Sequence, residues 1–325
     1  MSSATSLATT LANGLRTLVG AGTTKPKGYR VIDVELKERI HLSPSLARLV
    51  FTGDDIASSR TLAPDQRIKL FFPSADGTLP NLPKQGDWHA ERRTMSQAQR
   101  PPMRTYTIRA LRTHACEMEV DFVMHGVTGP ASAWATHARP GDRLQMVVPN
   151  LAFSGDPGGY EWRPPAGTRS VLLIGDETAL PALAGILEQL SLQASGLQVQ
   201  AFIEVPEEAD CLPLHLHPSI QLSWLPRDVL QCGHGEGMIH AARELSQLPQ
   251  AQIDSARVKP LKSVDIEQQI LWETAAPPGN TDFYAWIAGE SAAVMNIRRY
   301  LISERGLDRR SLTLMGYWRL GRALD

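Results

Sequence analysis

The chain has 325 residues, of which 42% are hydrophobic, and this length is enough for two domains of ordinary size. Its formal net charge of −1 gives no basic field, so composition does not suggest a nucleic-acid-binding protein. Three scattered cysteines (Cys116, Cys211 and Cys232) and nine histidines without metal-ligand spacing argue against a disulfide framework and a structural zinc site.

The first 28 residues contain no acidic side chain and are rich in Ser, Thr and Ala. The stretch "LATTLANGLRTLVGAG" lacks a continuous apolar core and carries Arg16 in its middle, so it does not predict a secretory signal. No apolar run has the length of a membrane span. We therefore expect residues 1–28 to be a flexible extension of a cytoplasmic protein that has no stable membrane association.

The first half of the chain is rich in short strand patterns that end in turn residues. Six strands are predicted, over residues 29–36, 46–53, 67–73, 104–111, 116–125 and 139–149. Residues 74–102 form a long polar loop between the third and fourth. Six short strands without long helices between them predict an antiparallel six-stranded β-barrel over residues 29–163.

The stretch "RTYTIRAL" (104–111) sets a guanidinium beside a phenol ring. Strand alternation gives it two faces, with Arg104, Tyr106 and Ile108 on one and Thr105, Thr107 and Arg109 on the other. A ligand with a phosphate at one end and a flat ring at the other explains Arg104 and Tyr106. Thr107 can then place a hydroxyl or backbone N–H near a ring nitrogen. The alternative is an exposed strand face.

The stretch "HGVTGPASAWATHARPGD" (125–142) follows the next predicted strand. Gly129 and Pro130 indicate a turn from which a helix starts. A helix start offers free N–H groups and positive dipole charge, and the small Ala131 and Ser132 leave room for a pyrophosphate. An ordinary Gly-Pro helix start explains the same residues. Together with Arg104, however, two anion-holding devices favour FAD over a mononucleotide.

The pattern changes after "PPAG" (164–167). Strands are predicted at residues 170–175, 197–205, 220–225, 283–290 and 311–318, and helices at 178–193, 237–248 and 291–306. Residues 249–281 show no clear period. Alternating strands and helices predict a parallel-sheet α/β domain over residues 164–325. A barrel followed by such a domain is an architecture that holds a flavin between the two domains and supplies it from a nicotinamide.

Two turns of the second half follow strands and precede helices, at "IGDETALPA" and "AGES". Gly175 and Gly289 permit the turns, and Thr178 can cap the first helix. Ligands of α/β domains bind at such carboxyl ends of parallel strands. Ordinary strand-to-helix turns of any α/β domain account for the same residues, and the dinucleotide fingerprint GxGxxG is absent.

Six stretches carry a family resemblance: "IKLFFP", "RTYTIR", "DFVMHGVTGPASAWATHARPGD", "GDETALPAL", "FYAWIAGESAAVMNIRRYL" and "GYWRLG". In this order, over most of residues 30–322, the chain resembles the siderophore-interacting proteins, FAD-dependent ferric-siderophore reductases related to ferredoxin reductases. The resemblance implies an FAD-binding barrel, an NAD(P)H-binding α/β domain and reduction of Fe(III) in a chelate to Fe(II), which releases the iron.

The resemblance also implies roles for residues of the first domain. Arg104 pairs with the pyrophosphate, and Tyr106 packs on the isoalloxazine with its neighbours Thr105 and Thr107 beside it. Further cofactor contacts are implied for Asp121, Phe122, His125, Pro130, Ala131, Ser132 and Trp134. Among these, Ala131 and Ser132 supply backbone N–H groups to phosphate. Trp134 covers the adenine side, although core packing is the commoner role of a Trp on a first helical turn.

In the second domain the resemblance places two loops near the flavin and the nicotinamide. Asp176, Thr178 and Ala179 are expected to contact the cofactor, and Gly175, Glu177, Gly289 and Glu290 the NAD(P)H donor. Tyr317 and Trp318 in "GYWRLG" are expected to bound the flavin ring and to form the catalytic set with Thr107. Two aromatics after an apolar strand also fit simple core packing.

A reductase of bulky, often anionic chelates needs an open basic pocket at the flavin's edge rather than a closed cleft, and no metal site of its own is expected. Lys69, Arg310 and Arg319 are the candidate substrate-binding residues, and solvated surface charge is the alternative for each. The family often has Gly-Pro and a basic residue after the last barrel strand, where this chain has "VPNLAF" with Asn150. This departure weakens the case for highly charged catecholates and leaves hydroxamate or carboxylate chelates open.

Two other functions fit the same sequence. One is a general NAD(P)H:flavin or ferredoxin-type reductase, and the other is a ferric-siderophore-binding protein without activity. Retention of "RTYTIR" and "GPASAW" argues against the second. The electron donor is left open between NADPH, NADH and a ferredoxin. We expect a monomer that has a ferric siderophore as its substrate.

Overall fold

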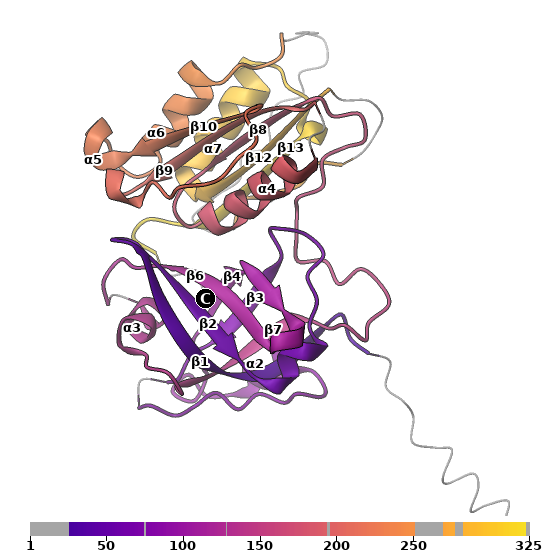
Figure 1. The fold of residues 1–325 in the computed structure, drawn as a ribbon, viewed down its shortest axis with the longest axis vertical. Coiled ribbons are helices and arrows are strands. Elements are labelled where there is room, and N and C mark those ends of the chain that lie inside the picture. Colours follow the sequence, from indigo (N-terminus) through magenta and orange to yellow (C-terminus); the bar gives the residue numbers. More distant parts are fainter. Residues whose placement is uncertain are drawn as a thin grey trace, which may run out of the picture.

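The computed structural model describes residues 26–74, 76–127, 129–193, 196–250, 269–276 and 282–322. These residues form a seven-stranded sheet in the first half of the chain and a six-stranded sheet with helices in the second half (Figure 1). The prediction of a β domain followed by an α/β domain is confirmed. The predicted extension 1–28 lies outside the described residues up to residue 25.

The first sheet is antiparallel and curls on itself (Figure 1). Its strands are β1 (Tyr29–Ser43), β2 (Leu46–Thr52), β3 (Arg67–Phe71), β4 (Met103–Thr107), β5 (Ala110–Arg112), β6 (Glu117–Val123) and β7 (Arg143–Pro149). They lie in the order β4-β3-β7-β1-β2-β6-β5, so the two edge strands follow one another in sequence. Only Ile108 and Arg109 lie between these edges.

The sheet has seven strands rather than the predicted six, because residues 104–111 form two strands. The backbone N–H of Ile108 donates to the carbonyl of Gln66, next to β3, at 2.9 Å. The following N–H, of Arg109, donates to the carbonyl of Glu119 on β6, also at 2.9 Å. The chain therefore changes its pairing partner between two successive residues, which bends it and divides the predicted strand.

The inner face of this sheet holds one hydrophobic core. On β6, alternation sends Met118, Val120 and Phe122 into the core. The intervening Glu119 and Asp121 face outward, where both pair with Arg48 of β2. This outer row of charges faces toward the second half of the molecule.

Two helices belong to the first half, α2 (Trp88–Thr94) and α3 (Pro130–His137). The start of α3 is confirmed, whereas α2 lies within the predicted polar loop 74–102. The Asp87 carboxylate caps α2 by accepting from the N–H groups of His89 and Ala90, each at 3.1 Å. Trp88 meets Phe71 of β3 edge-on, with ring centres 5.4 Å apart, so α2 is fixed against the sheet.

The second sheet contains five parallel strands and one antiparallel edge strand. Its strands are β8 (Ser170–Gly175), β9 (Gln198–Val205), β10 (Ile220–Pro226), β11 (Trp272–Glu273), β12 (Phe283–Glu290) and β13 (Leu312–Trp318). The order is β10-β9-β8-β12-β13-β11, and β11 runs antiparallel to β13. The edge strand β11 was not predicted, and most of the segment 249–281 lies outside the described residues.

Helices cover both faces of the second sheet (Figure 1). They are α4 (Leu180–Gln193), α5 (Arg227–Leu230), α6 (Glu236–His240) and α7 (Ser291–Arg299), and π-helical turns, Ala241–Leu245 and Tyr300–Glu304, extend the last two. Short 3₁₀ segments lie at Asp54–Ser58, Thr113–Ala115, Glu208–Asp210 and Arg309–Ser311. One core lies under α4 and another under α6 and α7.

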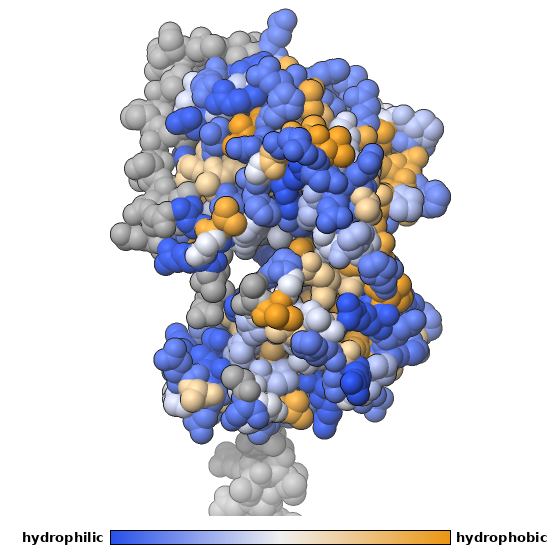
Figure 2. Space-filling view, turned by 90° about the vertical axis from the view of Figure 1, so that its left-hand side faces the viewer, coloured by the Kyte–Doolittle hydropathy of each residue, from blue (hydrophilic) through white to orange (hydrophobic). Residues whose placement is uncertain are grey.

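The two halves meet at a waist, and on the face seen in Figure 2 apolar residues lie in small groups between polar ones. Leu46 of β2 belongs to the core under α4. Pro64 lies so close to Gly185 of α4 that a Cβ there would stand 3.0 Å from its ring. Ser43 at the end of β1 donates to the Asp210 carboxylate at 2.6 Å. Apolar and polar contacts thus both join the halves.

Candidate functional site

Strand β4 presents the predicted cofactor residues on two faces, as alternation requires. In its pairing with β3, Tyr106 lies opposite Ile68 and Arg104 opposite Leu70, so both point to the inner side of the sheet. Thr105 lies opposite Lys69 and Thr107 opposite Arg67, on the outer side. Thr107 is buried and Thr105 is exposed.

Aromatic rings connect β4 with α3. Tyr106 stacks on Phe122 with ring centres 4.2 Å apart, and its burial raises the pKa of the phenol. Phe122 meets Phe72, which in turn lies 5.8 Å from the ring of Trp134 on α3. Trp134 also stacks on Phe51 at 6.1 Å. Trp134 is therefore packed against the barrel core, and these contacts bring the two predicted FAD-binding stretches together.

The first turn of α3 suits a phosphate group. Its N-cap is Gly129, whose N–H donates to Ser132 Oγ at 3.3 Å, and in the described part of the chain no side chain accepts from the N–H groups of the first turn. Ala131 packs into the same core cluster as Tyr106 and Phe122. A helix start leaves its first N–H groups without intrahelical partners, so the N–H groups of Ala131 and Ser132 are suited to an anion. The residues present thus fit the pyrophosphate of FAD.

Three other predicted cofactor residues belong to the first half of the chain. Arg104 is partly buried and donates through Nη1 to its neighbour's carbonyl, Met103 O, at 2.7 Å. His125 is exposed and lies two residues beyond β6. Pro130 opens α3 directly after its Gly129 N-cap.

Asp121 is held by arginines on the outer face of β6. Its carboxylate accepts from Arg48 Nε at 2.7 Å and Nη2 at 3.0 Å, and Arg109 Nε lies 3.7 Å away. Arg109 in turn pairs with Glu188 of α4 in the other half of the molecule. The Asp121 carboxylate is therefore engaged by arginines of the chain itself.

The outer face of β3 is basic. Arg67 and Lys69 are two residues apart and therefore share this face. Lys69 Nζ lies 3.4 Å from Thr105 Oγ1. Burial lowers the pKa of Lys69, and the positive charges of Arg67 and Arg92 lower it further. A cluster of cations that disfavour one another is suited to an anionic ligand.

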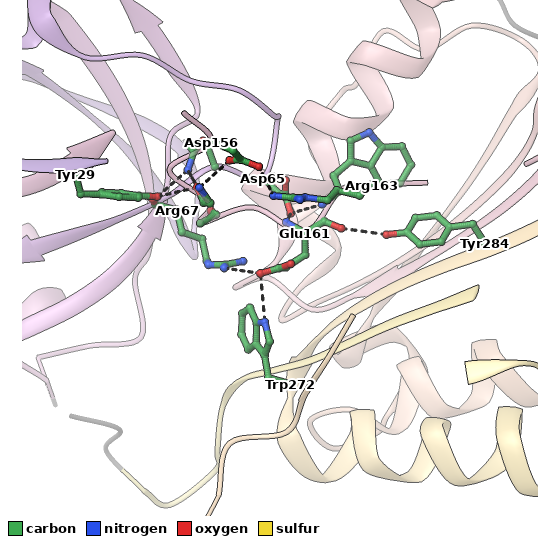
Figure 3. A network of polar contacts seen from close by, with 12 residues as sticks. Tyr29, Asp65, Arg67, Asp156, Glu161, Arg163, Trp272 and Tyr284 are labelled. Carbon is green, nitrogen blue, oxygen red and sulfur yellow. Dashed lines mark hydrogen bonds and ion pairs between the residues drawn. The ribbon is translucent and has the colours of Figure 1, made fainter. Parts of the chain in front are cut away.

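A polar network centred on Glu161 joins this face to the second sheet (Figure 3). Arg67 Nη2 and Trp272 Nε1 both donate to Glu161 Oε1, at 2.9 and 3.3 Å. The Asp65 carboxylate accepts from the N–H of Glu161 at 2.7 Å, and the Tyr284 hydroxyl donates to the Glu161 carbonyl at 3.2 Å. Glu161 thus ties β3 to β11 and β12.

Tyr317 lies within the same contact region. Its ring stacks on Trp272, with centres 5.9 Å apart and planes at 11°, and meets Trp286 edge-on. Burial raises the pKa of Tyr317, and the charge of Arg67 reaches its hydroxyl. Both the Tyr317 hydroxyl and Arg67 Nη1 are buried, and contact between the Arg67 guanidinium and the phenol opposes the rise in the pKa of Tyr317. The two groups thus lie against each other beside the cofactor strand.

The carboxyl edge of the second sheet carries the other predicted residues. Asp176 is buried, and Trp318 donates to its Oδ2 from the indole Nε1 at 2.7 Å. Thr178 donates to Asp176 Oδ1 through both its N–H and its hydroxyl. Thr178 was predicted to cap the helix start, but in the structure its hydroxyl donates to Asp176 instead. Ala179 is buried under the first turn of α4.

Glu177 belongs to a buried ion-pair network. Arg227 donates to both Glu177 oxygens, at 2.8 and 2.9 Å, and to Glu204 Oε1 at 2.9 Å. Glu204 also accepts from the N–H groups of Gly235 and Met238 at the start of α6. Burial opposes the charge on Arg227, but the two carboxylates raise its pKa overall. The Glu177 carboxylate thus has a structural partner within the chain.

Packing explains the two predicted glycines of this edge. A Cβ on Gly175 would lie 2.8 Å from Leu183 Cδ1 and 2.9 Å from the Ala288 carbonyl. A Cβ on Gly289 would lie 2.5 Å from Asp176 Oδ2. The neighbouring Glu290 caps α7, since its Oε2 accepts from the N–H groups of Ala292 and Ala293.

The structure separates the three candidate substrate residues. Lys69 lies on the outer face of the first sheet, and Arg319 directly follows Trp318 at the carboxyl end of β13. Arg310 pairs with Asp308 just before β13 begins. Seven strand residues separate it from Arg319, a distance of roughly 20 Å. Arg310 is therefore not brought together with the other two.

A pocket of about 300 Å³ lies beside the segment that links the two sheets. It is lined mainly by apolar and aromatic residues, including Pro64, Tyr160, Trp162 and Leu190, and by none of the predicted site residues. In the described part of the chain, no His, Cys, Asp or Glu residues cluster as metal ligands. Among the same residues, no helix has the length and apolarity needed to span a bilayer.

Sequence reasoning did not single out several residues of this region. Arg67 could have been found, because it shares a strand face with Lys69. Glu161, Trp272 and Arg227 gave no local signal, since their partners lie far away in the sequence.

Comparisons with known proteins agree with this arrangement. The siderophore-interacting FAD-binding domain matches residues 35–153, and the siderophore-interacting protein domain matches residues 168–321. Because these models cover most of the chain, it belongs to the siderophore-interacting proteins, which confirms the resemblance. Its FAD-binding domain and the relatives named below identify it as a member of an oxidoreductase family.

Three similar proteins illustrate this family. The chain is 26% identical over 296 residues to the ferric vibriobactin reductase ViuB of Vibrio cholerae, covering 90% of each chain. It is 28% identical over 295 residues to the NADPH-dependent ferric-chelate reductase of Escherichia coli, covering 89% of this chain and 92% of the relative. The crystal structure of a siderophore utilization protein from T. fusca superposes with a TM-score of 0.67 at 27% identity, covering 92% and 96% of the two chains.

Proposed function

We propose that the protein is an FAD-dependent reductase that uses NAD(P)H to reduce the Fe(III) of ferric siderophores to Fe(II), which the chelator then releases. The observation that carries this proposal is the contact of Arg67 with Trp272 and Tyr317. It brings the outer face of the predicted flavin strand β4 and its neighbour β3 to the aromatic end of β13.

Different residues of the chain bind the cofactor phosphates, the flavin ring and the substrate. Arg104 and the open start of α3 bind the phosphates, and Tyr106 presents a ring surface to the cofactor. Thr107, Tyr317 and Trp318 bound the reactive ring. Bound FAD supplies the redox chemistry, since it accepts a hydride and gives up single electrons. Lys69, on the outer face of β3, attracts an anionic ferric chelate.

The first experiment is an anaerobic titration of the purified protein with NADPH and, separately, with NADH. The flavin absorbance is expected to bleach with at least one donor and to return when a ferric siderophore is added. A protein that stays free of flavin after incubation with FAD would contradict the proposal. If neither nucleotide bleaches the flavin but a reduced ferredoxin does, the ferredoxin takes the place of NAD(P)H as the electron donor.

A second comparison separates the substrate from a general reductase. The rate of flavin reoxidation is measured against increasing ferric hydroxamate siderophore and against ferric citrate. Saturation with the siderophore alone supports a siderophore reductase. Equal, unsaturated rates with both chelates would support a general reductase.

A further inference from the structure

One buried carboxyl group joins three neighbouring strands of the second sheet. Asp176 follows β8 and is 1% exposed. Its Oδ1 accepts from Thr178 N at 2.9 Å and from Thr178 Oγ1 at 2.5 Å. Its Oδ2 accepts from Glu290 N at 2.8 Å and from Trp318 Nε1 at 2.7 Å. These contacts link the ends of β8, β12 and β13, which are adjacent in the sheet.

The hydrogen-bonding capacity of Asp176 is used within the chain. An ionised carboxylate accepts about four hydrogen bonds, two at each oxygen. All four are made to Thr178, Glu290 and Trp318. Asp176 therefore affects a neighbouring ligand through the groups it holds rather than by direct contact.

Trp318 is the partner of Asp176 that contributes an aromatic ring, at the carboxyl end of β13. Its single N–H donor is engaged by Asp176. Its carbonyl accepts from Ser291 Oγ at 2.7 Å, and its ring meets His234 edge-on at 5.3 Å. The orientation of the indole thus depends on Asp176, whereas Ser291 fixes the backbone.

We propose that Asp176 is a positioning residue, which fixes the indole of Trp318 where it bounds the flavin and nicotinamide site. The inference rests on the proposed function for the role of Trp318. Gly289 leaves the space that the Asp176 carboxylate occupies, because a Cβ at this position would lie 2.5 Å from Asp176 Oδ2.

The strength of this contact depends on the charge of Asp176. Burial and the neighbouring Glu177 raise the pKa of Asp176 to about 7, although its bonds from Thr178 and Trp318 oppose the rise. A protonated Asp176 can donate to Thr178 Oγ1, the only hydroxyl among its partners. Trp318 then donates to a neutral acceptor, and such a bond is weaker than one to a carboxylate.

The other charged groups near this contact have their own partners. Glu177 pairs with Arg227. The Glu290 carboxylate is turned to the start of α7. His234 Nδ1 lies 4.0 Å from Glu177 and its ring meets Trp318 edge-on, so a His234→Gln variant is needed to separate its effect on Trp318 from that of Asp176.

The test is an NMR titration of the indole N–H signals of the flavin-loaded protein, labelled at its seven tryptophans. Trp318→Phe identifies the signal of Trp318. Between about pH 5 and about pH 9, this signal is expected to titrate in the wild type and in His234→Gln, but not in Asp176→Asn. Asp282→Asn, at the exposed amino end of β12, is the control and is expected to keep the titration. Loss of the titration in His234→Gln, or its persistence in Asp176→Asn, would overturn the proposal.

Steady-state kinetics supply a second readout that needs no Asp176 variant. Trp318→Phe removes a donor that lowers the pKa of Asp176, so the transition in kcat/KM for the nicotinamide donor should move to higher pH. KM for this donor should rise severalfold while FAD is retained, because the ring at position 318 is no longer held by Asp176. An unchanged pH profile and KM would overturn the proposal. Failure of both nucleotides to reduce the flavin would instead contradict the proposed function and leave the NMR result standing.

Discussion

The guanidinium carbon of Arg67 lies 4.5 Å from the centre of the Trp272 ring, and this contact joins β3 of the first sheet to β11 of the second. Arg67 also donates to Glu161, which accepts from Trp272 as well. The basic face beside the predicted flavin strand therefore lies against the aromatic end of the second sheet. The mutations below test what each side of this contact region does.

Arg104→Ala is expected to lose FAD and reductase activity together. A hydrogen bond to a charged group contributes about 1.5–3 kcal/mol, so FAD should bind at least about tenfold more weakly. The measurement is flavin content per protein after gel filtration, followed by an FAD titration. Arg93→Ala, an exposed arginine on α2, is the control and should keep its flavin. Full occupancy in Arg104→Ala would refute the assigned role.

Lys69→Met is expected to weaken binding of an anionic ferric chelate while flavin reduction stays unchanged. A partly exposed charge contributes up to about 1 kcal/mol, so KM for the chelate should rise up to about fivefold. The difference should shrink as salt is added, because salt screens the charge. KM is measured at low and high ionic strength, with Arg93→Ala as the control. A KM that does not depend on Lys69 at low salt would remove it from the substrate site.

Asp121→Asn is expected to destabilise the protein without selective loss of FAD. The side chain is 7% exposed and pairs with Arg48, and breaking a buried pair costs about 3 kcal/mol. Urea unfolding and FAD affinity are measured at a temperature where the variant is folded. Loss of FAD without a change in stability would show instead that the Asp121 carboxylate binds the cofactor.

Arg227→Met is expected to cause a large loss of stability, because it leaves Glu177 and Glu204 buried without their cation. The cost of such a change is about 3–5 kcal/mol. Arg243→Met breaks the surface pair with Glu304 and should cost far less. Urea unfolding of both variants provides the comparison. Equal losses of stability in the two variants would mean that burial does not determine the contribution of the Arg227 ion pairs.

Asp176 gives a pH dependence with a definite sign. The folded chain holds its proton up to about pH 7, whereas the ordinary value for this carboxyl group is 3.8. The folded state therefore binds more protons in this window, so its stability falls as pH rises. Compared with Asp176→Asn, the wild type should lose thermal stability between about pH 4 and about pH 7 and change little above. If the unfolding midpoint of the wild type instead rose relative to that of Asp176→Asn between about pH 4 and about pH 7, the assignment would be contradicted.

Much of the fold could be predicted because pattern and structure agree in the buried strands. Ser170–Gly175 and Phe283–Glu290 are continuous apolar runs, and their predicted bounds are those observed. The division of residues 104–111 could not be predicted, since alternation continues through Ile108 and only the pairing partner changes. Trp272–Glu273 is too short a strand for any periodic pattern.

The candidate site was predictable where its residues share one strand. Period two placed Arg104 and Tyr106 on one face of β4, and the structure has them so. The partners of Asp121 and Glu177 were not predictable, because Arg48 and Arg227 lie 73 and 50 residues away along the chain. A predicted ligand residue can thus be engaged by a distant side chain that sequence spacing does not reveal.

The two helix starts near this site differ in electrostatic character. At α3 the N-cap is a glycine, whereas at α7 the Glu290 carboxylate already accepts from two N–H groups. A phosphate approaching α3 is attracted, and one approaching α7 is repelled by a fixed negative charge. The two helix starts therefore differ in how favourably they receive a phosphate group.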